Sequence, residues 1–142
     1  MKGMLLGMAA LAAAFFVSPT PSLAASLVAR IDIGSQTMTV SEGGRVLYQW
    51  KVSTARKGYV TPRGTYRPQR LHRMWYSRKY DMSPMPYSVF YSGGYAVHGT
   101  GYVKSLGRPA SHGCVRLATS NARTFYEMVR RHGSRNTRII LR

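Results

Sequence analysis

Apolar runs of strand length, separated by turn residues, recur along most of the chain. They fall at residues 27–33, 36–40, 46–52, 87–91 and 95–98. Gly-containing turns at 41–44 and 92–94 join two pairs of these runs, which predicts β-hairpins. The pattern therefore favours a β-rich fold whose core is built from several short strands.

Two other stretches have a different pattern. Prolines and glycines interrupt residues 53–86, where we expect loops and short strands rather than a long helix. From Thr119 onward, apolar residues recur at helical spacing up to a stop at Gly133, with Thr119 or Ser120 as the N-cap. Residues 137–141 then form a closing strand. The sequence thus predicts a single, mainly β domain with one helix near the C-terminus.

The N-terminal segment has the features of a secretory signal peptide. Lys2 precedes an uncharged run at 4–17, and small residues and prolines follow up to Ala24. The alternative, an uncleaved membrane anchor, is disfavoured because a span needs about 20 apolar residues. We therefore expect residues 1–24 to be a signal peptide cleaved near Ala24, and residues 25–142 to be the exported domain.

The charge composition excludes several chemistries. The 142 residues include 21 Lys and Arg but only 4 Asp and Glu, which gives a formal net charge of +17. Such scattered carboxylates disfavour a glycosidase-like acid pair and a carboxylate-rich Mg²⁺ or Ca²⁺ site. The single cysteine, Cys114, allows neither an internal disulfide nor a zinc site built on several thiolates. Any reaction must then rely on His, Cys, hydroxyl, Arg and backbone groups.

His98 and Cys114 are the candidates for catalysis. His98 ends a predicted strand, and a Gly-rich basic loop returns the chain so that Cys114 can approach it. A nearby imidazole can lower the pKa of a thiol, so that a thiolate–imidazolium pair forms near neutral pH. The N–H groups of Gly113 and Cys114 are natural donors to an oxyanion. This arrangement suits acyl transfer, although a lone cysteine can also be an inert buried residue.

Two motifs give the chain a family resemblance. Ser-His-Gly-Cys-Val-Arg at 111–116 follows His-Gly-Thr at 98–100, and Thr-Pro-Arg-Gly-Thr-Tyr occupies 61–66. Together they resemble the signature of the L,D-transpeptidase catalytic domain, the YkuD-type family, over roughly residues 27–142. The resemblance implies a β-sandwich or barrel fold with one C-terminal helix.

The resemblance also implies roles for individual residues. Cys114 matches the nucleophile and His98 the base, while His112, Gly113 and Ser111 belong to the motif that shapes the oxyanion pocket. Whether His112 takes part in the chemistry or holds the loop by a hydrogen bond stays open. A zinc site made from the two histidines and the cysteine is disfavoured because no carboxylate is near to act as a base. We expect neither a metal nor a cofactor.

Three further residues complete the predicted site. The resemblance implies that the backbone carbonyl of Gly99 orients the imidazole of His98, which suits a segment without Asp or Glu. It also implies that Arg116 orders the site or meets a substrate carboxylate. Tyr87 is a candidate for lining the substrate cleft.

The family's reaction would proceed through an acyl-enzyme. Cys114 would attack the carbonyl of diaminopimelate in a peptidoglycan tetrapeptide stem and release D-Ala. The acyl group would pass to an amine of a neighbouring stem, a free D-amino acid or an envelope protein, whereas water would give L,D-carboxypeptidase activity. The predicted export indicates a periplasmic, wall-associated enzyme, and the excess of Lys and Arg leads us to expect contact with an anionic wall or membrane surface.

A different class of function fits the charge alone. An excess of Lys and Arg is also typical of a basic binding protein, including one for nucleic acid. The predicted export disfavours nucleic acid as the partner, and the one predicted helix lacks a groove-reading pattern of basic residues. The alternative is therefore a non-enzymatic protein that binds the wall or another polyanion.

Overall fold

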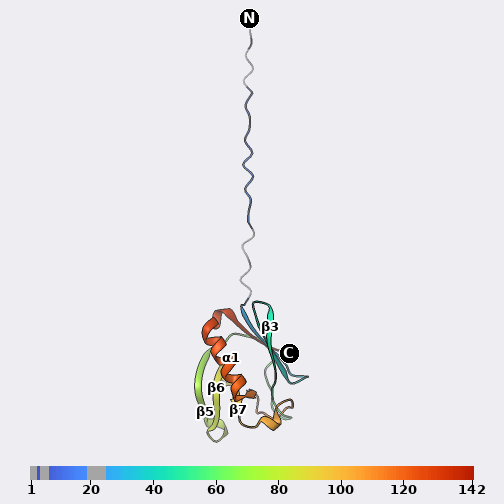
Figure 1. Ribbon diagram of the computed structural model, residues 1–142, viewed down its shortest axis with the longest axis vertical. Helices are drawn as coiled ribbons and strands as arrows, with labels where there is room; N and C mark the ends of the chain where they lie inside the picture. The colour runs from blue at the N-terminus through green and yellow to red at the C-terminus, as the bar shows by residue number, and fades with distance from the viewer. Residues whose placement is uncertain (1–2, 4–6, 19–24) are drawn as a thin grey trace.

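The computed structural model describes residues 3, 7–18 and 25–142, and Figure 1 shows the fold of the last range. Lys2 and the cleavage point expected near Ala24 lie outside the described residues, so the signal peptide stays a prediction. Within the described part of the chain, no helix has the length and apolar character needed to cross a membrane.

Two β-sheets and one helix form the domain. The first sheet has the order β3-β2-β1-β9-β4, with β1 (Leu27–Asp32), β2 (Thr37–Glu42), β3 (Arg45–Lys51), β4 (Gly64–Tyr66) and β9 (Thr137–Leu141). The second has the order β5-β6-β7-β8, with β5 (Arg70–Ser77), β6 (Ser83–Ser92), β7 (Tyr95–Thr100) and β8 (Val115–Ala118). The helix α1 (Thr119–His132) follows β8 directly. These elements confirm the predicted mainly β domain with one C-terminal helix.

The helix α1 lies between the two sheets and contacts β6, β7 and β8 as well as β1 (Figure 1). Its apolar face carries Phe125, which is fully buried together with Leu117 of β8 and Ile139 of β9. Removing this apolar surface from water is the main favourable contribution to folding. The main core therefore covers one face of the second sheet, and the opposite face lies outside this core.

Alternation decides which side chains of β1 reach this core. Leu27, Ala29 and Ile31 are at most 1% exposed, whereas the residues between them point away from the core. The strand pairs antiparallel with β2 and parallel with β9, so it is a central strand of its sheet. The alternation that the sequence shows at residues 27–33 is thus the alternation of core and surface positions.

The opposite face of the second sheet carries a smaller apolar cluster. Met85, Phe90 and Ala96 are buried there, and Trp75 and Cys114 pack against them. Neighbouring residues on the same strands, such as those of β7, alternate between this cluster and the main core. The second sheet is therefore apolar on both faces, and its outer face contains the only cysteine.

Residues 70–86 are more regular than the sequence predicted. The strand β5 has 8 residues and β6 has 10, although the latter contains Pro84 and Pro86. Both prolines pair with β5, while β7 pairs with β6 only from Val89 onward. The prolines therefore lie where β6 has a single neighbouring strand, and their missing N–H groups interrupt no ladder on the other side.

The helix start also differs from the expectation. Ala118 is the residue before the first turn, and neither Thr119 nor Ser120 caps the helix with its side chain. The Thr119 hydroxyl instead donates to the carbonyl of Thr100, 3.4 Å away in β7. The predicted stop is confirmed, because Gly133 ends the helix at a φ of +80° and its N–H donates to the Val129 carbonyl.

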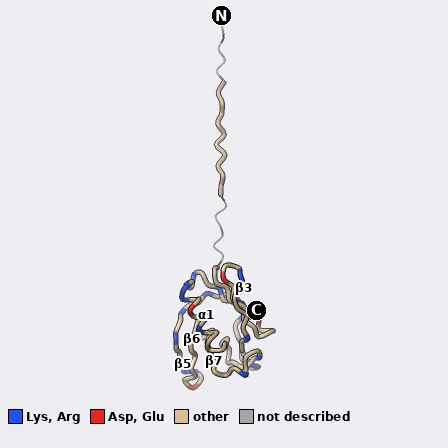
Figure 2. The backbone as a smooth tube through the Cα atoms, in the orientation of Figure 1, with Lys and Arg blue, Asp and Glu red and all other residues tan. Residues whose placement is uncertain are grey.

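Basic residues are spread over both sheets and the helix (Figure 2). The few acidic residues are scattered among them, and Glu127 of α1 lies 3.9 Å from Arg73 and 3.5 Å from Arg130. Exposed ion pairs of this kind contribute little to stability. Most of the positive charge is therefore left without a nearby carboxylate.

Candidate active site

The pairing of β7 with β8 decides where the candidate catalytic residues lie. The two strands are parallel, with Val97 opposite Val115 and His98 opposite Arg116. Opposed residues share a face of the sheet, and so do residues two positions apart. His98 and Arg116 therefore point to the face opposite the main core. Cys114, two residues before Arg116, packs against the apolar cluster on that same face.

The connection between these parallel strands is a loop at 101–114 that contains one short 3-10 helix, η2 (Val103–Ser105), and no α-helix. A neighbouring segment holds it in place: Ser53 and Arg116 exchange backbone hydrogen bonds of 3.0 and 2.9 Å. The Thr54 carbonyl accepts bonds from the N–H groups of Ala110 and Ser111. The loop is therefore fixed at both sides of the cysteine, which compensates for the lack of regular structure.

A buried glutamine supports this segment, and no pattern in the sequence indicates that role. Gln36 is 3% exposed and has a φ of +54°. Its side chain donates to the Thr54 hydroxyl at 2.6 Å and accepts from the Thr54 N–H at 2.9 Å. A glutamine in a predicted strand is an ordinary surface residue in sequence terms, so only the fold reveals that it links the first sheet to the loop that carries Cys114.

His98 is held in one orientation and in a neutral state. Its side chain is 6% exposed, and Nδ1 lies 2.7 Å from the Gly99 carbonyl oxygen. A carbonyl only accepts, so Nδ1 carries the proton and Nε2 keeps its lone pair. Burial, aided by the positive charge of Arg116, lowers the pKa of His98 to about 4 even though the bond to Gly99 opposes this shift. The imidazole is therefore a base at neutral pH.

The thiol of Cys114 is also neutral at rest. Sγ lies 3.8 Å from the Gly94 carbonyl oxygen, and the side chain is half-buried. Burial raises the pKa of Cys114, while a backbone hydrogen bond from Ala96 and the charge of Arg116 act in the opposite direction. Burial penalises both charges and therefore disfavours the expected thiolate–imidazolium pair as the resting state.

A tight turn positions the backbone just before the cysteine. Gly113 has a φ of +136°, and a Cβ at this position would lie 2.6 Å from Cε1 of Tyr95. Its N–H donates to the Ser111 hydroxyl at 3.0 Å, and that hydroxyl donates to the Cys114 carbonyl at 2.6 Å. The Gly113 N–H, which we expected to donate to an oxyanion, is therefore already hydrogen-bonded within the protein. The Ser111 hydroxyl stabilises the turn through its two hydrogen bonds.

The Thr-Pro-x-Gly motif meets the same turn from the other side. The Thr61 hydroxyl donates to the Gly113 carbonyl at 2.8 Å and accepts from the Ala55 N–H at 2.9 Å. One buried hydroxyl thus joins three separate segments of the chain. This contact gives the motif a physical role next to the cysteine.

His112 lies between two tyrosine rings. The ring of Tyr80 is stacked on it at 4.1 Å and 10°, and Tyr59 meets it edge-on at 4.8 Å. Burial, together with the charges of Arg56 and other nearby basic residues, lowers the pKa of His112. These are packing contacts, so they favour the structural alternative for His112, with ring stacking in place of the expected hydrogen bond.

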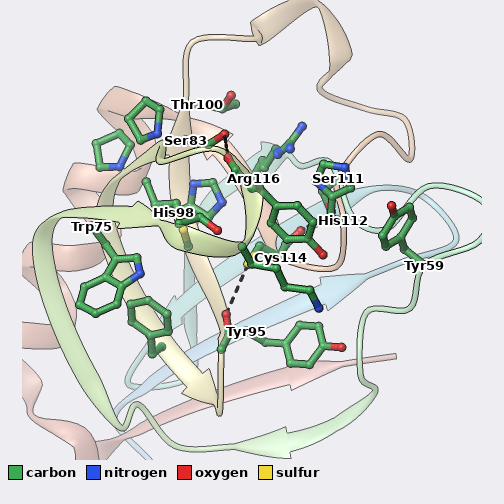
Figure 3. Close-up of a pocket in the computed structure, with 18 of the residues that line it drawn as sticks. Tyr59, Trp75, Ser83, Tyr95, His98, Thr100, Ser111, His112, Cys114 and Arg116 are labelled. Atoms are coloured by element: carbon green, nitrogen blue, oxygen red, sulfur yellow. Dashed lines mark hydrogen bonds between the residues drawn. The ribbon is translucent and has the colours of Figure 1, made fainter.

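A cavity of about 1220 Å³ joins most of the predicted site residues. Its lining includes Cys114, His98, Arg116, Ser111 and His112. Figure 3 shows the cysteine between a wall that contains Trp75 and a wall that contains Tyr59.

Tyr87 does not line this cavity. Its backbone has a φ of +52°, and its ring packs against Tyr126 of α1 with 5.6 Å between the ring centres. The side chain belongs to the main core, on the other face of the sheet. The prediction that Tyr87 contacts substrate therefore has no support from the geometry.

The described residues also contain no group of three or more His, Cys, Asp or Glu side chains placed to hold a metal ion.

A family model identifies the chain. Residues 26–140 match the model of the YkuD family, the L,D-transpeptidase catalytic domain. The chain belongs to this family, which confirms the resemblance seen in its motifs. A search among curated proteins found no match.

Solved structures with the same fold agree with this assignment. An L,D-transpeptidase from Mycobacterium smegmatis is 27% identical, with a TM-score of 0.74 over 82% of this chain and 58% of its own. One from Stackebrandtia nassauensis is 26% identical, with a TM-score of 0.72 over 82% and 55%. One from Xylanimonas cellulosilytica is 29% identical, with a TM-score of 0.70 over 88% and 64%. The chain thus spans less than two thirds of the length of these structures.

Replacing the glycine of the turn tests how tightly it is constrained. We expect Gly113→Ala to lower the free energy of unfolding by about 1–3 kcal/mol, because of its strained φ and the clash with Tyr95. Urea unfolding measures the loss. Gly101→Ala is the matched control, since a Cβ there meets nothing within 4 Å. An equal loss in both variants would contradict the assignment of strain to this turn.

The protonation state of the thiol predicts how its reactivity depends on pH. Only the thiolate reacts with iodoacetamide, and burial raises the pKa of Cys114. We expect the alkylation rate of the native protein to keep rising above pH about 8.5, the usual pKa of a thiol. The same protein in urea should reach its plateau at lower pH. A plateau of the native protein between pH 5 and 8 would instead indicate a thiolate–imidazolium pair.

Proposed function

We propose that this protein is a cell-wall L,D-transpeptidase that uses Cys114 as its nucleophile. The observation that carries the proposal is the buried, neutral His98 on the same sheet face as the thiol, with Nε2 free to accept a proton. A neutral base next to a neutral thiol suits an attack in which sulfur loses its proton as it forms the new bond. Membership of the transpeptidase family makes a peptidoglycan stem peptide the substrate class that fits best.

In the first half of the reaction, the thiol attacks the carbonyl of diaminopimelate in a tetrapeptide stem. His98 takes the thiol proton, and the carbonyl oxygen gains the negative charge. Arg116 lies half-buried near the sulfur, and its positive charge stabilises the thiolate character that the sulfur gains as it loses its proton. When the tetrahedral intermediate collapses, the proton on His98 passes to the amine of the leaving D-Ala, and a thioester remains on Cys114.

In the second half, an amine attacks the thioester and the thiol is regenerated. The amine belongs to a neighbouring stem, a free D-amino acid or an envelope protein. A cavity of about 1220 Å³ exceeds the usual size of a small-molecule site, about 300–1,000 Å³, which favours a site that holds a donor and an acceptor together. Hydrolysis of the same thioester would make the protein an L,D-carboxypeptidase.

The first experiment compares the purified protein with its Cys114→Ala variant on tetrapeptide muropeptides. We expect loss of D-Ala and formation of cross-linked dimers with the wild type, and neither product with the variant. Mass spectrometry of the muropeptides measures both products. Val46→Ala, at an exposed position of β3, is the control and should retain both activities. Product formation by Cys114→Ala would exclude the thiol as nucleophile.

The proposal extends to location. The predicted signal peptide would export the protein to the periplasm and would be removed with Lys2, and the net charge of +16 that remains would draw the domain to the anionic wall or membrane surface. The low number of carboxylates leaves this attraction nearly unopposed over the whole domain (Figure 2).

Wall contact of this kind depends on salt. We expect the fraction of protein that sediments with isolated sacculi to fall as NaCl rises from 0.05 to 1 M, because the screening length shrinks to about 3 Å at 1 M. Cys114→Ala should show the same salt dependence, since its charge is unchanged at neutral pH. Binding that is insensitive to salt would contradict an electrostatic contact.

A further inference from the structure

The cavity around Cys114 is lined by cations and by no acid. Among the described residues that line it, Arg70, Arg78, Lys79 and Arg116 are basic, and none is Asp or Glu. Walls with charge of one sign concentrate the field inside a cavity and attract ligands of the opposite charge. The cavity therefore suits a ligand that carries carboxylates.

Arg70 is held against two aromatic rings. It is directly opposite Phe90 in the β5–β6 ladder, and its guanidinium carbon lies 3.7 Å from the centre of that ring. The same carbon lies 4.8 Å from the ring of Trp75. Contact with the aromatic faces holds the plane of the guanidinium and leaves its N–H edges free. Much of the entropy cost of fixing this long side chain has therefore been met before any ligand binds.

The guanidinium of Arg70 has no acidic partner among the described residues. The ion pairs found there join Arg73 and Arg130 to Glu127, and His132 to Glu42. Arg116, by contrast, is half-buried and donates to the carbonyl of Ala110 at 3.5 Å. The planar fork of Arg70 thus remains available for a carboxylate, which it matches in a bidentate geometry.

The position of Arg70 relative to the thiol follows from the apolar cluster between them. Phe90 is in that cluster, and both Trp75 and Cys114 pack against it. Arg70 covers the ring of Phe90 and contacts the ring of Trp75, so it lies on the Trp75 side of the cavity. Figure 3 shows Trp75 and Tyr59 on opposite sides of Cys114. A peptide whose carbonyl lies at Cys114 and whose chain follows the Trp75 wall would bring a neighbouring carboxylate to this guanidinium.

We propose that Arg70, stacked on Phe90 and Trp75, is a carboxylate-binding site for a peptide bound on the Trp75 side of Cys114. The inference rests on the proposed function for the identity of the peptide, a wall stem. The carboxylate belongs either to the acyl donor or to the amine acceptor, since a wall stem carries carboxylates in either role. The stacked cation selects ligands by charge at a place separate from the reacting carbonyl.

The direct test measures binding without turnover. In the Cys114→Ala background, we expect Arg70→Gln to weaken binding of a tetrapeptide stem about tenfold in isothermal titration calorimetry, as for a lost charge-assisted hydrogen bond. Arg73→Gln is the matched control, because it removes a cation from the same strand that already pairs with Glu127. It should change the Kd less than twofold. Equal effects of the two substitutions would overturn the proposal.

Amidated ligands separate a carboxylate contact from a structural effect. A series of stems is made in which a different carboxylate is converted to an amide in each. We expect one of these amidated stems to bind the protein with Arg70 about tenfold more weakly than the unmodified stem. The Kd of that stem should not change further in Arg70→Gln, whereas the Kd values of the other amidated stems should still rise. If every amidated stem responds equally to the substitution, Arg70 only shapes the cavity. The ligand series with Arg70 intact also tests the proposal if the Gln variant does not fold.

Turnover distinguishes the two sources of the carboxylate. Arg70→Gln in the enzyme with Cys114 should raise KM for the donor stem if the donor carries the carboxylate. It should raise KM for the acceptor if the acceptor does, with little change of kcat in either case. An effect on kcat alone would overturn the assignment as a binding site. If the wild-type protein releases no D-Ala, the proposed function fails, while the calorimetric result for Arg70 still stands.

Discussion

The parallel register of β7 and β8 is the constraint on which the site depends. Because Val97 lies opposite Val115, His98 and Arg116 share one face of the sheet and Cys114 joins them there. A shift by one residue would turn these side chains into the core and bring valines to the cavity. The register is fixed mainly by burial of the two valines and Leu117 against α1. The hydrophobic core thus positions polar groups that it does not contain.

Burial controls the chemistry as well as the geometry. His98 and Cys114 lie on the same face of the second sheet, and burial disfavours the charged form of each. The pair is therefore neutral at rest, and charge separates only as the thiol attacks. Arg116 supplies a fixed positive charge close to the sulfur at that moment. The low carboxylate content fits this arrangement, since the carbonyl of Gly99 orients the imidazole without adding a negative charge.

Much of the fold could be predicted from local pattern, and the failures have local causes. The strands at both ends of the domain and the helix up to Gly133 follow from alternation, helical spacing and a glycine stop. The length of β5 and β6 could not be predicted, because prolines are acceptable only where a strand has one neighbour. The predicted N-cap of the helix was wrong because the hydroxyl of Thr119 donates to the carbonyl of Thr100 in β7 instead.

The sequence by itself determined the family, through the motifs at 61–66, 98–100 and 111–116, and selected His98 and Cys114 as a candidate pair. The sequence was sufficient for this because each motif is a contiguous run of residues, and the chemistry of a motif follows from its residue types. The tertiary structure decided what the pattern could not express. It placed Tyr87 in the core, engaged the Gly113 N–H with Ser111, and stacked Arg70 on Phe90. Those outcomes depend on which segments meet in space, and burial and pairing between distant segments decide that.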